Sequence, residues 1–279
     1  MPLTSAQVKG RIKSIAQKKH ADARILLRLY AMERFLERLG NSRYADHFVI
    51  KGGILVTAMV GVSMRSTMDI DASVRNENLT ADDAKRILNE IAHIDLDDGM
   101  TFSVKSVDSI MDEMEYPGIR IMMDAVMEKM VIPLKIDIST GDVITPGAVV
   151  FQYPMMLENR SINLWSYNLE TVLAEKLQTV LARGILNTRM RDFYDIRSLF
   201  LLYKDTINTQ TLKQAFEATC RKRGTVDLEG QGEKILEAIE NSEDINALWM
   251  AYQKKYSYAS EVSLLEILQC IREMISIVE

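Results

Sequence analysis

Cysteine and histidine are scarce in this chain of 279 residues. The only cysteines are Cys220 and Cys270, and the three histidines, His20, His47 and His93, form no ligand pair. Two cysteines are too few for a disulfide framework, and these residues together do not supply the spaced Cys and His ligands of a zinc site. The sequence therefore excludes a disulfide-stapled secreted domain, and it fits a protein of the reducing cytoplasm.

Long apolar runs are also lacking. No run approaches the roughly 18 residues that a membrane-spanning helix needs. The N-terminal stretch MPLTSAQVKGRIKS contains no apolar segment of the kind found in signal peptides. With 47% hydrophobic and 26% charged residues, the composition is that of an ordinary globular protein. We therefore expect a cytoplasmic protein with no membrane partner.

An excess of positive charge is absent as well. The net charge of −5 argues against a general nucleic-acid-binding protein. The charge is uneven, because lysine and arginine dominate residues 1–30 whereas acidic residues dominate residues 77–128. A basic arm beside an acidic flank could steer a polyanion to one side of the molecule, although solvated helix faces would show the same pattern.

The stretch 47–73 combines a glycine pair with two closely spaced carboxylates. An apolar run ends at Gly52-Gly53, and Asp69 and Asp71 follow in a second predicted strand, where alternate side chains share a face. Two such carboxylates repel each other unless a cation lies between them, and Mg²⁺ is held by one or two carboxylates plus substrate phosphates. A strand ending in Gly-Gly also lets backbone N–H groups approach a phosphate. We therefore predict a Mg²⁺ (or Mn²⁺) site for a nucleoside triphosphate, although a solvated strand face would have the same Asp-x-Asp spacing.

A third carboxylate lies on a later strand. Residues 131–139 alternate, with Leu134, Ile136 and Ile138 on one face and Asp137 on the other. In two-metal transfer, a third carboxylate binds or orients the metal that activates the attacking hydroxyl. We predict Asp137 as that third metal ligand or as the general base, with an exposed polar residue as the alternative.

The remaining periodicity predicts an α+β fold. We expect a domain with a mixed sheet over residues 1–155 and an all-helical domain over residues 156–279, since only helical periodicity follows Trp165. A turn is expected at Tyr116-Pro117-Gly118. The predicted strands are 47–51, 67–74, 101–108, 118–126 and 131–139. The predicted helices are 5–18, 22–39, 54–60, 81–93, 168–183, 211–222, 231–240, 243–256 and 260–278.

The helical part carries its own candidate residues. Lys176 falls within the apolar stripe of helix 168–183, so it must snorkel, pair with a carboxylate or meet an anionic ligand. Arg191 and Asp195 stand four residues apart, which fits a structural ion pair. As a functional alternative, Arg189 or Arg191 could clamp a triphosphate while Asp195 holds Lys176 in place.

Several blocks together resemble one family. They are Tyr30–Leu36, Phe48–Gly53, Arg65–Asp71, Lys135–Asp142, Leu173–Leu177 and Arg191–Asp195, in this order. The run is similar to the AbiEii/AbiGii nucleotidyltransferase toxins. The resemblance implies a DNA polymerase β-like nucleotidyltransferase domain, Mg²⁺ and an NTP as substrate, and a cognate antitoxin as partner. By motif it makes Asp69 and Asp71 metal ligands, and Lys176 and Asp195 a second essential pair.

The resemblance also implies a reaction. Some members add nucleotides to tRNA 3′ ends and so block translation, and we expect the same of this chain in a toxin–antitoxin or abortive-infection pair. Gly52-Gly53 would be the triphosphate turn. The wider superfamily has Gly-Ser there, so Ser66 or Thr67 would supply the missing hydroxyl, with Arg65 beside them as a further nucleotide-binding residue.

Three alternatives remain open from the sequence. The nucleotide, or a phosphate, could go to a protein target instead of RNA. A sugar-nucleotide transferase also uses Asp-x-Asp with a divalent metal, although Asp137 and the helical domain argue against it. Finally, the chain could be a binding partner with a degenerate, non-catalytic site.

Overall fold

The computed structural model describes residues 3–75, 79–110, 118–228 and 230–279, and these form two compact units. One unit contains Met1–Asp142 and Val149–Ser166, and the other contains Val143–Ala148 and Tyr167–Glu279. Tyr116 and Pro117 of the expected turn lie outside the described residues. No helix among the described residues is long and apolar enough to span a bilayer.

The first unit is built on a mixed sheet. Within the described residues its seven strands run in the order β3-β4-β5-β2-β1-β7-β6. The pairs β2–β5 and β1–β7 are parallel, and the other neighbouring pairs are antiparallel. The strands are β1 (Phe48–Lys51), β2 (Asp69–Val74), β3 (Thr101–Ile110), β4 (Gly118–Met127), β5 (Met130–Thr140), β6 (Val149–Pro154) and β7 (Ser161–Ser166). The central strands β5, β2 and β1 therefore come from three distant parts of the chain.

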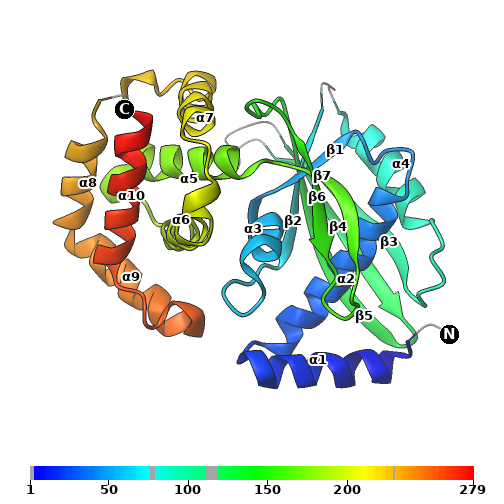
Figure 1. Ribbon diagram of the computed structural model, residues 1–279. Coiled ribbons are helices and arrows are strands. Elements are labelled where there is room, and N and C mark those ends of the chain that lie inside the picture. The colour runs from blue at the N-terminus through cyan, green and yellow to red at the C-terminus, as the bar shows by residue number, and fades with distance from the viewer. Residues whose placement is uncertain (1–2, 76–78, 111–117, 229) are drawn as a thin grey trace. The chain divides into compact units, whose positions relative to one another are not determined.

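Apolar and charged side chains are separated across these central strands. Ile70, Ala72 and Ile136 are each at most 2% exposed and share one face of the sheet, because they alternate with charged neighbours. Helix α2 (Ala23–Gly40) crosses the sheet in contact with β5 and β7 (Figure 1). Helix α4 (Ala81–Ala92) contacts β3, β4 and α2, while α1 (Ser5–Lys19) packs on α2 and α3 (Gly52–Val60) follows β1. The hydrophobic core thus leaves the opposite face of β2 and β5 for polar side chains.

A carboxyl group is buried in this core. Glu33 of α2 is 2% exposed, and its carboxyl oxygens accept a hydrogen bond from the backbone N–H of Met156 at 3.1 and 3.3 Å. Burial raises the pKa of Glu33 from 4.5 to about 8, against the lowering by the Met156 N–H and Arg34. The side chain is therefore mostly protonated at neutral pH.

Replacing Glu33 with glutamine is expected to remove a pH dependence of stability. Because the pKa of Glu33 is higher in the folded than in the unfolded protein, protonated Glu33 stabilises the folded state fully below pH 4.5. This stabilisation is lost as the pH rises to about 8. The Glu33→Gln protein should match the wild type at pH 5 and exceed it at pH 9 by on the order of 3 kcal/mol of unfolding free energy. Urea unfolding at both pH values measures this, and equal pH profiles for the two proteins would contradict it.

The second unit is helical. Its helices are α5 (Leu169–Arg183), α6 (Met190–Tyr203), α7 (Thr209–Lys222), α8 (Gly232–Glu240), α9 (Glu243–Lys255) and α10 (Leu264–Val278). Helix α5 packs on α6 and α7, and α10 lies against α6, α7 and α8 (Figure 1). Both cysteines are buried and outside any disulfide of the described residues, Cys220 on α7 and Cys270 on α10. The segment 143–148 joins this unit, where the Asn168 amide donates to the backbone oxygen of Thr145 at 2.6 Å.

The α+β prediction is confirmed, and the differences are local. The sheet continues past residue 155 through β7, so the helical unit starts at Tyr167 instead of 156. Strands β6 and β7 were not predicted, because the prolines and glycines around them are typical of a linker. Helix α3 begins at Gly52 instead of 54, and β2 begins at Asp69 instead of 67. Helix α10 begins at 264 instead of 260, because Ser263 and Glu266 form a capping box.

Candidate active site

The turn between β1 and α3 carries the glycine pair. Gly52 has a φ of +59°, a conformation that only glycine adopts without strain. The N–H of Gly53 donates to Asp71 Oδ2 at 3.1 Å, so the turn touches the second predicted metal ligand directly. The turn therefore helps to fix the position of the Asp71 carboxylate.

The glycines make room for neighbouring side chains of the protein. A Cβ on Gly52 would lie 2.7 Å from Asp71 Cγ, and one on Gly53 would lie 2.5 Å from Thr67 Oγ1 and 2.7 Å from Arg65 Nη1. Carbon atoms do not approach so closely without displacement. The space beside the glycine Cα atoms, which we expected to admit a phosphate, is thus occupied by Asp71, Thr67 and Arg65.

A Gly52→Ala substitution should therefore displace Asp71. We expect the loss of more than about 100-fold in any activity that needs this carboxylate, with a stability cost of about 1–3 kcal/mol from the left-handed backbone. Gly10→Ala is the matched control, because nothing lies within 4 Å of a Cβ there. Initial rates and thermal melts of both variants test the point. A Gly52→Ala protein with wild-type activity would show that Asp71 tolerates movement.

The registers of β1, β2, β5 and β4 place four charged residues in one row. Lys51 pairs with Asp71, Asp71 with Asp137, and Asp137 with Arg120. Directly paired residues point to the same face. The predicted carboxylates Asp71 and Asp137 are therefore side by side, with a cation at each end of the row.

Asp137 is held by two cations. Arg120 donates from Nε to Oδ1 at 2.9 Å and from Nη2 to Oδ2 at 3.0 Å, the bidentate arrangement of a strong ion pair. Lys135 Nζ lies 3.5 Å from Asp137 Oδ2 and 3.0 Å from Asp69 Oδ2. Asp69 is the more exposed carboxylate, with 37% of its side chain accessible.

The electrostatics of the row favour a bound cation. Burial raises the pKa of Asp71 above its usual value, and the charges of Asp137 and Asp69 add to this, against the lowering by the Gly53 N–H and Lys51. A divalent ion beside Asp69 and Asp71 would relieve both the burial and the repulsion, so this carboxylate pair fits a metal. Within the described residues, however, no group of three acidic, His or Cys side chains is arranged to hold a metal ion. The predicted metal role of Asp137 stays a prediction.

Lys51 has a partner outside the row. Its ammonium pairs with Asp142, which is fully buried and also accepts from the Ser139 hydroxyl at 2.8 Å. Lys51, Arg120, Lys135 and Asp142 were not singled out as site residues from the sequence. Lys135 is two residues from Asp137 and shares its strand face, so the alternation of β5 could have indicated it. Arg120 joins the site only through strand register.

The residues after α3 support the turn. Arg65 is 2% exposed and donates to the Gly53 backbone oxygen at 2.8 Å and to Thr57 Oγ1 at 3.2 Å. Thr67 is buried as well, at 4% exposure, while Ser66 is half-buried. The Arg65 guanidinium thus contacts the protein backbone at the turn, and its predicted nucleotide contact stays a prediction.

The helical unit brings its predicted residues together around Lys176. Lys176 Nζ lies 2.8 Å from Asp192 Oδ1 and 2.8 Å from Asp195 Oδ2, and its side chain is 11% exposed. Arg189 Nε pairs with Asp192 Oδ2 at 2.7 Å. Burial would raise the pKa of Asp192, but Lys176 and Arg189 hold it below its usual value. The lysine on the apolar stripe is thus paired with carboxylates, and one of them, Asp192, was not among the predicted site residues.

Arg191 takes a different partner from the one considered. Its Nη2 donates to the Tyr256 hydroxyl at 3.3 Å, and its guanidinium lies 5.9 Å from that ring. Tyr256 follows α9, far along the chain. The expected Arg191–Asp195 pair rested on local spacing alone, which does not predict a partner from a distant segment.

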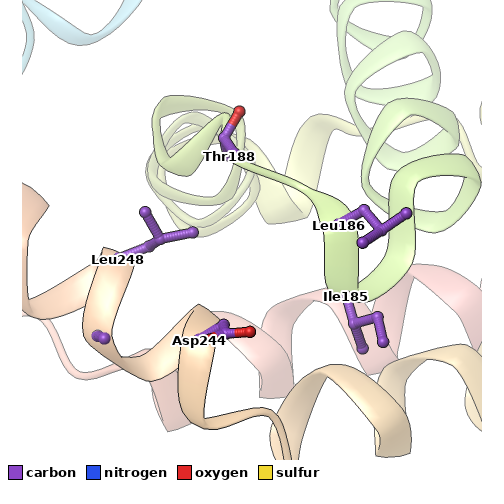
Figure 2. Close-up of a pocket in the computed structure, with 6 residues that line it drawn as sticks. Ile185, Leu186, Thr188, Asp244 and Leu248 are labelled. Atoms are coloured by element: carbon purple, nitrogen blue, oxygen red, sulfur yellow. The ribbon is translucent and has the colours of Figure 1, made fainter.

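A pocket of the helical unit is a poor nucleotide site. Figure 2 shows Ile185, Leu186, Thr188, Asp244 and Leu248 around it, and Ala247 completes the lining. Its only charge is negative, and phosphate binding needs cations or backbone N–H groups. None of the predicted site residues lines this pocket.

Comparison with known proteins agrees with these observations. The family model described as nucleotidyl transferase AbiEii toxin, type IV toxin–antitoxin system, matches residues 34–269. A structure from H. pylori described as a nucleotidyltransferase is 16% identical, with 91% of this chain and 94% of that chain covered and a TM-score of 0.50. JHP933 from Helicobacter pylori is 15% identical, with 91% and 93% covered and the same TM-score. None of the curated proteins matches in sequence.

The two structural likenesses show a shared fold, and the family match covers most of the chain, including Asp69, Asp71, Lys176 and Asp195. The chain therefore belongs to the AbiEii nucleotidyltransferase toxin family of type IV toxin–antitoxin systems.

Proposed function

We propose that this chain transfers a nucleotide from an NTP to an RNA 3′ hydroxyl, with tRNA as the acceptor and Mg²⁺ as the metal. The observation that carries the proposal is the Asp69/Asp71 pair beside the Gly52-Gly53 turn, on the polar face of the sheet. Modified tRNA would no longer serve translation, which makes the chain a toxin of the cytoplasm. An antitoxin partner follows from membership of a type IV family.

The reaction assigns distinct tasks to the residues. The RNA hydroxyl oxygen gives up its proton to solvent and forms a bond to the α-phosphorus. The bond from that phosphorus to the bridging oxygen breaks, and pyrophosphate leaves with its electron pair. When bound, Mg²⁺ would neutralise the phosphate oxygens and lower the pKa of the attacking hydroxyl. Asp69 and Asp71 would hold it. Gly53 keeps Asp71 in position through its N–H, so that charge in the site is ordered before substrate arrives.

Lys176 and Asp195 belong to the proposal on the family resemblance. The structure brings them into contact at 2.8 Å within the helical unit. An ammonium paired with two carboxylates is held in one orientation, which suits a group that meets an anionic substrate. Arg189 and Arg191 are further cations of this unit that we propose for phosphate contacts.

The test is a labelled transfer reaction. The purified chain is incubated with Mg²⁺, total tRNA and each α-³²P-labelled NTP in turn, with EDTA as the control. Label on tRNA that EDTA abolishes would support the proposal and identify the nucleotide. Label on neither tRNA nor protein would contradict it and favour a non-catalytic binding module.

A second candidate is transfer to a protein. The same carboxylate pair would serve a hydroxyl from a protein side chain, because the metal site contacts only the triphosphate and the attacking oxygen. Label on a protein band instead of tRNA would favour it. A γ-labelled NTP then separates phosphate transfer from nucleotide transfer, since only phosphate transfer carries the γ-label to the target.

A further inference from the structure

Both carboxylate oxygens of Asp137 contact cations. Both of its oxygens receive hydrogen bonds from Arg120, at 2.9 and 3.0 Å, and Lys135 approaches Oδ2 at 3.5 Å. Its side chain is only 9% exposed. Both oxygens of Asp137 are thus engaged by cations, as expected of a carboxylate that holds neighbouring cations in place.

The two cations border the carboxylate pair. Arg120 is one strand away from Asp137, which is beside Asp71, and Lys135 is the register partner of Asp69. Both side chains are 28% exposed, in contrast to Arg65 and Arg38, which are at most 2% exposed. Arg120 and Lys135 therefore reach solvent on the face that carries Asp69 and Asp71.

A triphosphate needs positive charge at this place. Asp69 and Asp71 repel a polyanion, and a cation beside them offsets that repulsion. An arginine held by a bidentate carboxylate keeps its guanidinium plane fixed, and a lysine shared by two carboxylates is kept near both. Asp137 touches both cations.

We propose that Arg120 and Lys135 form a triphosphate-binding subsite, and that Asp137 is the positioning residue that holds them. This inference rests on the proposed use of an NTP. Lys135 Nζ also lies 3.0 Å from Oδ2 of Asp69. A divalent ion held by Asp69 would compete with this ammonium for the carboxylate, and its binding would free Lys135 for phosphate.

The experiment separates metal affinity from phosphate affinity in the full chain. Mn²⁺ binding alone is measured by electron paramagnetic resonance, and binding of inorganic tripolyphosphate in the presence of Mn²⁺ by calorimetry. Tripolyphosphate avoids any dependence on the unknown base. The variants are Lys135→Met and Asp137→Asn. Lys129→Met is the control, since Lys129 is exposed beyond the end of β4.

The inference predicts opposite changes for Lys135→Met. Mn²⁺ should bind about 3- to 10-fold more tightly because a competing cation is gone, whereas tripolyphosphate should bind about tenfold more weakly. Asp137→Asn should leave Mn²⁺ affinity within about threefold and weaken tripolyphosphate binding about tenfold. A merely structural role would move both affinities together.

Three results would overturn the inference. They are loss of Mn²⁺ binding in Asp137→Asn, unchanged tripolyphosphate binding in Lys135→Met, and parallel loss of both ligands in either variant. In each case the NTP proposal survives if the wild type binds Mn²⁺ and the Asp71→Ala variant does not. If the wild type binds neither Mn²⁺ nor tripolyphosphate, both proposals fail. Because Asp137→Asn could disturb Arg120, thermal melts accompany the titrations, and Lys135→Met provides the independent test.

Discussion

An Asp71→Asn protein is expected to transfer nucleotide about 10²- to 10³-fold more slowly than the wild type, with its fold intact. Asparagine keeps an oxygen that can accept from the Gly53 N–H, so the 3.1 Å contact survives. What disappears is the negative charge that would hold the metal at the α-phosphate, and charge stabilisation of this kind is worth about 3–4 kcal/mol of barrier.

Stability should not fall with the activity. Burial and the neighbouring carboxylates already disfavour the charged form of Asp71, so removal of that charge relieves repulsion. The melting temperature should therefore stay level or rise. Asp82→Asn is the matched control, because Asp82 is exposed at the start of α4. Initial rates with Mg²⁺, NTP and RNA, beside circular-dichroism melts, measure both. Retention of the rate within tenfold in Asp71→Asn would remove this residue from the chemistry.

A Lys176→Met protein is expected to lose about 3–5 kcal/mol of unfolding free energy in the helical unit, together with transfer activity. The substitution leaves Asp195, whose side chain is 0% exposed, without its ammonium 2.8 Å away. Removal of one partner from a buried ion pair leaves an uncompensated charge. Asp192 keeps Arg189 at 2.7 Å, so the cost should arise chiefly at Asp195.

Urea unfolding and transfer rates together separate two roles of Lys176. Lys234→Met is the control, because Lys234 is exposed on α8. A destabilised but fully active Lys176→Met protein, assayed well below its melting temperature, would make the cluster structural only. Unchanged stability would contradict the ion-pair argument itself.

Local patterns predicted the elements and the faces well. Alternation placed Asp69 and Asp71 on one polar face of β2, and Asp137 on the polar face of β5, as the structure has them. Helical spacing placed Lys176 in a buried stripe and therefore demanded a partner for it, which the structure supplies as Asp192 and Asp195. Both patterns depend only on the geometry of a single element.

Other features depended on contacts between distant segments. Arg120 contacts Asp137 because of the register between β4 and β5, which the periodicity of a single strand does not predict. Arg191 donates a hydrogen bond to Tyr256, which follows α9, although Asp195 lies one turn away on its own helix. Strands β6 and β7 join the sheet through pairing with β1 across a long stretch of chain.

The sequence by itself determined the α+β fold, the polar strand faces, the carboxylate pair and the lysine that needs a counter-charge, because each is written in the spacing of neighbouring residues. Only the tertiary structure decided that the Gly52-Gly53 turn closes on Asp71 and that Arg120 and Lys135 hold Asp137. The reason is physical: spacing fixes which way a side chain points, whereas its partner is fixed by which strands exchange hydrogen bonds and in what register.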